Sequence, residues 1–444
     1  MRRILIGSAA ALAAVAVAAL GISQLQPNLA QADGKKDKAP RYAVDESWPK
    51  ALPHQWQIGQ VPGISVDVDD NVWIVQRPHT LTNDERGASD FDQPPGAPAG
   101  TPRLLDGAAR PQGSISDCCL PAPSVMQFSP KGDLLRAWGG PADPDKCVET
   151  ADEATTCQWP NSEHGIYVDH KDNVWLGGQG GGSVLKFTKN GQFLMQIGRR
   201  TAPVRNSNDT NGGVRGTPLL AQPADLEVDP KTNELYIADG YTNLRVVVVD
   251  AANGMYKRHW GAYGQRPVDD TGNIGPYIKN QVPAPHFRNP VHAVRITNDG
   301  LIYVADRTND RIQVFDKKKA GAEDCQNPTG ARGVCGFLGE IFVEPDTLGP
   351  GSTWDLDVSP DKRQKFLFNA DGSNNYIWTL LRSTGEILDR FGRNGRMAGQ
   401  FHWVHNMAVD SKGIMYTAEV DTGKRVQKFV PRGKSKGHDD DDDD

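Results

Sequence analysis

The 444-residue chain lacks an excess of positive charge, since 49 Lys and Arg residues face 55 Asp and Glu residues. Without a basic excess the sequence offers no electrostatic footprint for nucleic acid, and we expect no nucleic-acid partner. Cysteines are few, six in all, and no CxxC motif occurs among them, which argues against a cysteine-based metal site. Long apolar runs are missing after the first 32 residues, so no later segment is expected to span a membrane.

The N-terminus carries the one long apolar stretch. A Met-Arg-Arg start, an apolar run over residues 4–22 and an "AQA" sequence at residues 30–32 form the pattern of a secretory signal. We expect residues 1–32 to be a signal peptide that exports the protein from a bacterial cytoplasm to the periplasm or the medium, with an uncleaved anchor as the alternative. Residues 33–41 and the acidic tail, 432–444, are expected to be disordered, the tail because a block of like charges repels itself.

The six cysteines fit an oxidising compartment. They are Cys118, Cys119, Cys147, Cys157, Cys325 and Cys335. The last two close a short loop, as do the two before them, so disulfides are expected. Adjacent cysteines rarely pair with each other, which leaves pairings between the first two and the middle two open.

Glycine and proline are abundant, with 47 and 31 residues, which indicates many turns and favours an all-β fold. Six times the chain repeats an alternating strand, a polar turn and a second strand. The copies are "GISVDVDDNVWIVQR", "HGIYVDHKDNVWLGG", "ADLEVDPKTNELYIADG", "HAVRITNDGLIYVADR", "WDLDVSPDKRQKFLFNADG" and "HNMAVDSKGIMYTAEV". Further short strands follow most copies, so the sequence predicts a six-bladed β-propeller over residues 42–431, with long loops over one face. The segment "HQWQIG", 54–59, is expected to supply the fourth strand of the last blade and close the ring.

One position of the repeat, at the start of each innermost strand, alternates between histidine and other residues. In blade order it holds Pro62, His164, Ala224, His292, Trp354 and His405. Because the innermost strands surround the central channel, residues at one end of alternate blades converge on its axis. Three imidazoles with a fourth side open form the ligand set of a catalytic zinc site. We therefore predict a zinc site on the three histidines, although three imidazoles suit several divalent ions.

Two arginines stand in register with the histidines, because a hairpin begins and ends at the same end of its blade, and a tyrosine comes one position later. Arg77 and Arg307 follow the second strands of blades one and four, and Tyr241 follows that of blade three. Two guanidiniums can bind a carboxylate by charge-assisted hydrogen bonds. A tyrosine beside a metal and an arginine can act as a base. The neighbouring Asp239 and Asp306 are expected to hold turns.

These motifs resemble the NHL-repeat propellers and, within them, the peptidyl-α-hydroxyglycine α-amidating lyases, the lyase half of the bifunctional peptide-amidating enzyme. The similarity runs from about Gly59 to Phe429 and is strongest in "AQPADLEVDPKTNELYIADGYTNLR" and "IYVADRTNDRIQVF". The resemblance implies zinc on the three histidines, the tyrosine as base and the two arginines in the active site. It implies a carbon–nitrogen lyase that cleaves a C-terminal α-hydroxyglycine to a peptide amide and glyoxylate.

The sequence departs from that family at several positions. Asn406 replaces an aspartate that helps to hold a structural calcium ion, so calcium is expected to bind more weakly here. Trp403 replaces a methionine, and Thr242 and Ala221 replace a cysteine pair. No copper monooxygenase half accompanies the propeller in this sequence, so we do not expect this chain to make α-hydroxyglycine itself.

Two other functions remain as alternatives. The first is a non-catalytic NHL propeller of the cell envelope that binds or scaffolds other molecules. The second is a calcium-dependent lactonase or hydrolase, which would need carboxylates and asparagine at the channel mouth in place of three histidines. We expect a monomer that acts on a small molecule or peptide with a carboxylate.

Overall fold

The computed structural model describes residues 37–88, 114, 116–140, 157–200, 205–269, 277–278, 283–321, 325 and 332–432. The predicted signal peptide and nearly all of the acidic tail lie outside these residues, as does most of the predicted loop 82–116. Among the described residues, no helix has the length and apolar character needed to cross a membrane.

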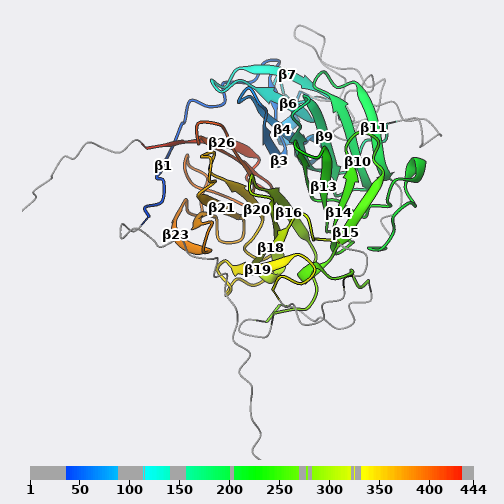
Figure 1. The fold of residues 1–444 in the computed structure, drawn as a ribbon. Helices are drawn as coiled ribbons and strands as arrows, with labels where there is room; N and C mark the ends of the chain where they lie inside the picture. The colour runs from blue at the N-terminus through cyan, green and yellow to red at the C-terminus, as the bar shows by residue number, and fades with distance from the viewer. Residues whose placement is uncertain are drawn as a thin grey trace, which may run out of the picture.

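Six four-stranded antiparallel sheets are arranged in a ring around a central channel (Figure 1). The prediction of a six-bladed β-propeller is therefore confirmed. Each of the first five blades is built from four strands in chain order, innermost first. Blades 1 to 3 are β3 (Gln60–Val66), β4 (Val72–Arg77), β6 (Val125–Phe128) and β7 (Leu134–Trp138); β8 (Glu163–Val168), β9 (Asn173–Gly178), β10 (Gly182–Thr188) and β11 (Phe193–Arg199); and β12 (Asp225–Asp229), β13 (Glu234–Asp239), β14 (Arg245–Asp250) and β15 (Tyr256–Trp260).

The remaining blades follow the same order, except that the last one borrows a strand. Blades 4 and 5 are β16 (Val291–Ile296), β17 (Leu301–Asp306), β18 (Arg311–Asp316) and β19 (Phe337–Phe342); and β20 (Asp355–Val358), β21 (Phe366–Asp371), β22 (Tyr376–Leu381) and β23 (Glu386–Phe391). Blade 6 contains β24 (Val404–Val409), β25 (Met415–Glu419), β26 (Arg425–Pro431) and, as its outer strand, β1 (Tyr42–Val44).

The ring closes through β1, which pairs antiparallel with β26 so that Tyr42 lies opposite Pro431. The prediction that residues 54–59 close the ring is wrong. Within that segment β2 (Trp56–Gln57) instead pairs parallel with β5 (Leu120–Pro121), outside the blades. Residues 37–41 were predicted as part of a disordered linker. The structure describes them, and the carbonyl of Arg41 accepts a hydrogen bond from the backbone N–H of Arg432.

The hydrophobic core is divided among the junctions between neighbouring blades. Each of six apolar clusters joins two adjacent blades; one brings Trp73 and Val75 of blade 1 against Ile166 and Leu176 of blade 2. Alternation along each strand turns one set of side chains to each neighbour, so every blade is packed on both faces. Such packing holds the inner strands, and whatever they carry, in fixed positions around the channel.

Disulfides are present, with one unexpected pairing. Cys325 bonds Cys335, as predicted from their spacing. Cys118 bonds its neighbour Cys119, contrary to the expectation that adjacent cysteines avoid each other. Cys157 is also in a disulfide, while Cys147 lies outside the described residues.

Candidate active site

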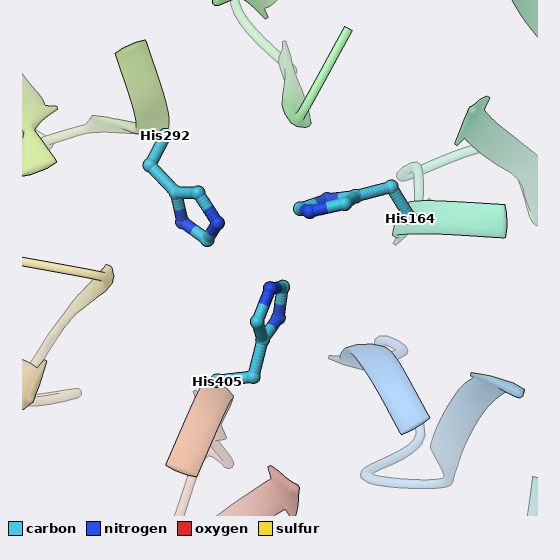
Figure 2. Close-up of side chains that lie close together, drawn as sticks. All are labelled: His164, His292 and His405. Carbon is cyan, nitrogen blue, oxygen red and sulfur yellow. The ribbon is translucent and has the colours of Figure 1, made fainter. Parts of the chain in front are cut away.

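The three histidines of the predicted zinc site lie together at one end of the channel. His164 on β8, His292 on β16 and His405 on β24 point their rings at a common centre (Figure 2). The ring centroids are 4.7–5.1 Å apart, and one ligand nitrogen from each lies within 4.8 Å of the others. All three side chains are at most 3% exposed.

β-bulges place these histidines in the channel. In blade 4, Val291 lies opposite Asp306 and Ala293 lies opposite Ala305, so His292 is the extra residue of the inner strand. The pairing shifts in the same way around the other two histidines, in blades 2 and 6. Blade 1 shifts in the same way around Pro62, whereas in blades 3 and 5 the strand pairing begins only after this repeat position. A bulge re-aims the side chain that it contains, here toward the channel axis.

Each histidine is oriented by a backbone carbonyl of the next blade. His164 Nδ1 lies 2.6 Å from the carbonyl of Ala224, His405 Nδ1 lies 2.7 Å from that of Pro62, and His292 Nδ1 contacts that of Trp354. A carbonyl only accepts, so Nδ1 carries the proton and Nε2 presents a lone pair to the centre. In the three blades that have no histidine at this repeat position, the residue found there (Pro62, Ala224 or Trp354) orients a histidine with its backbone carbonyl. This role could not be predicted from the sequence, because every residue has a backbone carbonyl.

The surroundings keep the imidazoles neutral. Burial lowers the pKa of all three histidines well below the ordinary value, and neighbouring charges add to the effect. For His405 these charges are the guanidiniums of Arg77 and Arg307, so both predicted arginines lie near the cluster. A neutral imidazole is the form that binds a metal.

Tyr241 lies directly against the cluster. Its hydroxyl oxygen is 3.0 Å from His164 Nε2 and 3.1 Å from His292 Nε2, and it accepts a hydrogen bond of 3.2 Å from Arg307 Nη1. A hydroxyl has one proton and can donate to only one of the two nitrogens. The second nitrogen then faces the centre with no donor from Tyr241, so the donor set fits a bound cation that satisfies all three lone pairs.

Turn residues fix Tyr241 and Arg307 at the ends of their hairpins. Asp239 accepts hydrogen bonds from the N–H of Ala221 and from the side chains of Asn243 and Arg245, at 2.7–2.9 Å. Asp306 is bound in the same pattern by Arg288, Asn309 and Arg311. The two aspartates thus hold turns, as predicted.

The two arginines differ in how far they are already engaged. Arg77 donates to the carbonyl of Glu163 and to the side-chain oxygens of Gln60 and Gln179, at 2.7–3.2 Å. Arg307 donates to the carbonyl of Pro350 and to Tyr241, and its Nη2 is not used in either bond. Arg307 is therefore better placed to bind an incoming carboxylate. The residues that hold Arg77 were not predicted from the sequence, because a glutamine at the start of β3 and one in the turn after β9 have no distinctive spacing.

The structure also shows the contacts of the residues that differ from the amidating-lyase pattern. The Asn406 side-chain oxygen accepts a hydrogen bond of 2.7 Å from the N–H of Ile64; binding of calcium there stays a prediction. Thr242 donates its N–H to the carbonyl of Ala221 at 3.2 Å, so the two positions adjoin without a disulfide. Trp403 packs against Trp354, beside the histidines.

Fold and repeat together define the class of this protein as a six-bladed β-propeller with an NHL repeat. A family model of the NHL repeat matches residues 289–315, the segment that carries His292 and Arg307.

The relatives are more specific. Peptidyl-glycine alpha-amidating monooxygenase B from Xenopus laevis is 30% identical over 60% of this chain, which spans only 26% of that protein. Peptidyl-alpha-hydroxyglycine alpha-amidating lyase 1 from Drosophila melanogaster is 25% identical, over 62% of this chain and 45% of that one. NHL repeat-containing protein 3 from Mus musculus is 27% identical, over 70% of this chain and 73% of that one. The predicted resemblance to amidating lyases is therefore confirmed, at low identity.

Proposed function

We propose that this protein is a zinc-dependent carbon–nitrogen lyase that cleaves an α-hydroxy amide bearing a carboxylate into an amide and glyoxylate. The observation that carries the proposal is the contact of Tyr241 with two of three converging histidines and with Arg307. Zinc bound by the three Nε2 atoms would supply Lewis-acid catalysis at an open coordination site. The similarity to amidating enzymes supports the same reaction.

The residues of the chain have separate tasks in this reaction. Arg307 holds the substrate carboxylate through its unused donors, and Tyr241, after giving up its own proton, takes the proton of the α-hydroxyl as a phenolate. The carbon–oxygen bond becomes the carbonyl of glyoxylate as the carbon–nitrogen bond breaks, and its electron pair goes to nitrogen. That nitrogen accepts one proton and leaves as the amide, so no oxidant or further reactant is consumed. The site carries two guanidiniums near neutral imidazoles, which suits an anionic substrate.

We also propose that the protein acts outside the cytoplasm, in the periplasm or the medium. The signal-like N-terminus and the disulfides support this location.

The test combines metal content with product formation. The purified protein is analysed for zinc and assayed for glyoxylate release from α-hydroxyhippurate. We expect one zinc per chain and glyoxylate formation, both lost in His292→Ala. His170→Ala is the matched control, because this histidine is exposed in the turn between β8 and β9, and it should retain both. No zinc after reconstitution would contradict the metal site, whereas zinc without glyoxylate would contradict the lyase reaction.

A non-catalytic binding role is the second candidate. The match to mouse NHL repeat-containing protein 3, whose name states no activity, covers more of both chains than the matches to the amidating enzymes given above. A protein of this kind would release no glyoxylate, so the same assay separates the two candidates.

A further inference from the structure

Two tryptophans, Trp354 and Trp403, form an aromatic wall on one side of the histidine cluster. Trp354 occupies the repeat position of the histidines on blade 5, and its ring centroid lies 5.7 Å from that of His292 and 5.5 Å from that of His405. Trp403 packs edge to face on Trp354 at 5.2 Å. Trp354 is only 3% exposed, whereas Trp403 is partly exposed. Trp403 is therefore the part of the wall that a ligand can reach.

The aromatic wall adjoins the residue proposed to hold the carboxylate. The guanidinium carbon of Arg307 lies 4.3 Å from the ring centroid of Trp354 and 5.6 Å from that of Tyr241. Stacking on an aromatic face, together with the hydrogen bond to the carbonyl of Pro350, fixes the orientation of this guanidinium. A carboxylate bound to Arg307 would therefore lie close to Trp354.

The other side of the site is polar. Arg77, with its partners Gln60 and Gln179, belongs to blades 1 and 2, while the aromatic wall belongs to blades 5 and 6. The substrate carbon that bears the hydroxyl also bears the carboxylate and the acylated nitrogen. With the hydroxyl at Tyr241 and the carboxylate at Arg307, the acyl group must extend over one of these two sides. An indole face offers no hydrogen-bond acceptor but matches a flat apolar group.

The backbone of Trp403 supports a functional role for its side chain. Its φ is 56°, in the left-handed region that bulky residues rarely adopt. The conformation is held by a hydrogen bond from its N–H to the side-chain oxygen of Asn375 at 2.8 Å and by one from the N–H of Val420 to its carbonyl at 3.2 Å. An unfavourable conformation kept in place beside an active site points to a use for the side chain that it presents.

We infer that the substrates are N-acyl-α-hydroxyglycines whose acyl group is aromatic or bulky and apolar, and that this group packs on Trp403. The inference rests on the proposed function, since it assigns the substrate class of the same site. A small acyl group such as acetyl leaves Trp403 uncovered and gains little binding from it.

The experiment compares a benzoyl with an acetyl substrate. We measure kcat/KM for glyoxylate release from α-hydroxyhippurate and from N-acetyl-α-hydroxyglycine, and the affinities of hippurate and N-acetylglycine, which lack the hydroxyl and are not cleaved. Trp403→Gly removes the indole and suits the positive φ, so it should fold at least as well as the natural chain. Trp56→Ala, a partly exposed tryptophan on β2, is the matched control.

We expect the natural protein to prefer the benzoyl compound roughly tenfold in both measurements. The preference should fall to about twofold or less in Trp403→Gly and persist in Trp56→Ala. The inference would be overturned if Trp403→Gly kept the same preference for the benzoyl compound as the natural protein. It would also be overturned if the natural protein had no preference. Hippurate binding that depends on Trp403, without glyoxylate release from either substrate, would support the aromatic wall while contradicting the lyase reaction.

Discussion

Gly240 offers a sharp test of how strictly Tyr241 is positioned. This glycine lies between Asp239 and Tyr241 and touches the strand that carries His292; a Cβ added to it would lie 1.9 Å from the carbonyl oxygen of Val291 and 2.4 Å from its nitrogen. Both contacts are with backbone, so no side chain can turn away to relieve them. In Gly240→Ala the turn must therefore move away from β16 by about 1 Å before the contact becomes tolerable, and a displacement of this size can reduce catalysis about 100-fold.

The measurements are kcat/KM for glyoxylate release and zinc content of the same preparation. We expect kcat/KM to fall about 100-fold because Tyr241 leaves hydrogen-bonding distance of His292, while stability falls by about 1–3 kcal/mol from overpacking. Zinc should stay stoichiometric, since the carbonyls that orient the histidines belong to other residues. Gly300→Ala is the control, because that glycine has no atom within 4 Å of its added Cβ; its φ is 82°, so this variant carries backbone strain without the clash. Unchanged turnover in Gly240→Ala would refute the claim that catalysis depends on this placement.

The remaining predictions concern the base and the pH dependence of stability. Tyr241→Phe should lower kcat by about 10²- to 10⁴-fold and leave zinc content intact; turnover equal to that of the natural protein would remove the tyrosine from the reaction. Burial, with the charges of Arg245 and Arg266, lowers the pKa of His259 to about 4. Because the unfolded chain binds this proton near pH 6.5 and the folded chain does not, stability falls as the pH drops from about 6.5 to 4. Urea unfolding should therefore show that the natural protein loses about 2 kcal/mol more than His259→Gln between pH 7.5 and pH 5, and parallel losses would contradict the assignment.

The sequence predicted the architecture well because each blade repeats one pattern. Six copies of a strand, a polar turn and a second strand are visible without any structure, and aligning them placed the histidines in one layer. The bulges around His292 and His405 could not be read in this way, since a bulge changes pairing and leaves the sequence unmarked.

Ring closure was predicted incorrectly for a related reason. The segment 54–59 reads like the fourth strands of earlier blades, whereas Tyr42–Val44 is a strand of three residues with no alternation to detect. The strand β1 is selected because it pairs with the open edge of β26. This partner is far away in sequence, so a local sequence pattern does not predict the pairing. The contact of Arg77 with Gln179 escaped prediction in the same way, because it joins residues of blades 1 and 2.

The hydrogen bond between His405 and the carbonyl of Pro62 has a consequence for the order of events in biosynthesis. It links residues 343 positions apart, across the junction between the last blade and the first. Until blade 6 has been synthesised and has docked on blade 1, only two of the three imidazoles can be in place. Contacts between residues this distant in sequence form late, because the loop between them must close first. Capture of a metal ion by all three histidines would then mark the completion of folding, and the metal would be acquired in whichever compartment the ring closes.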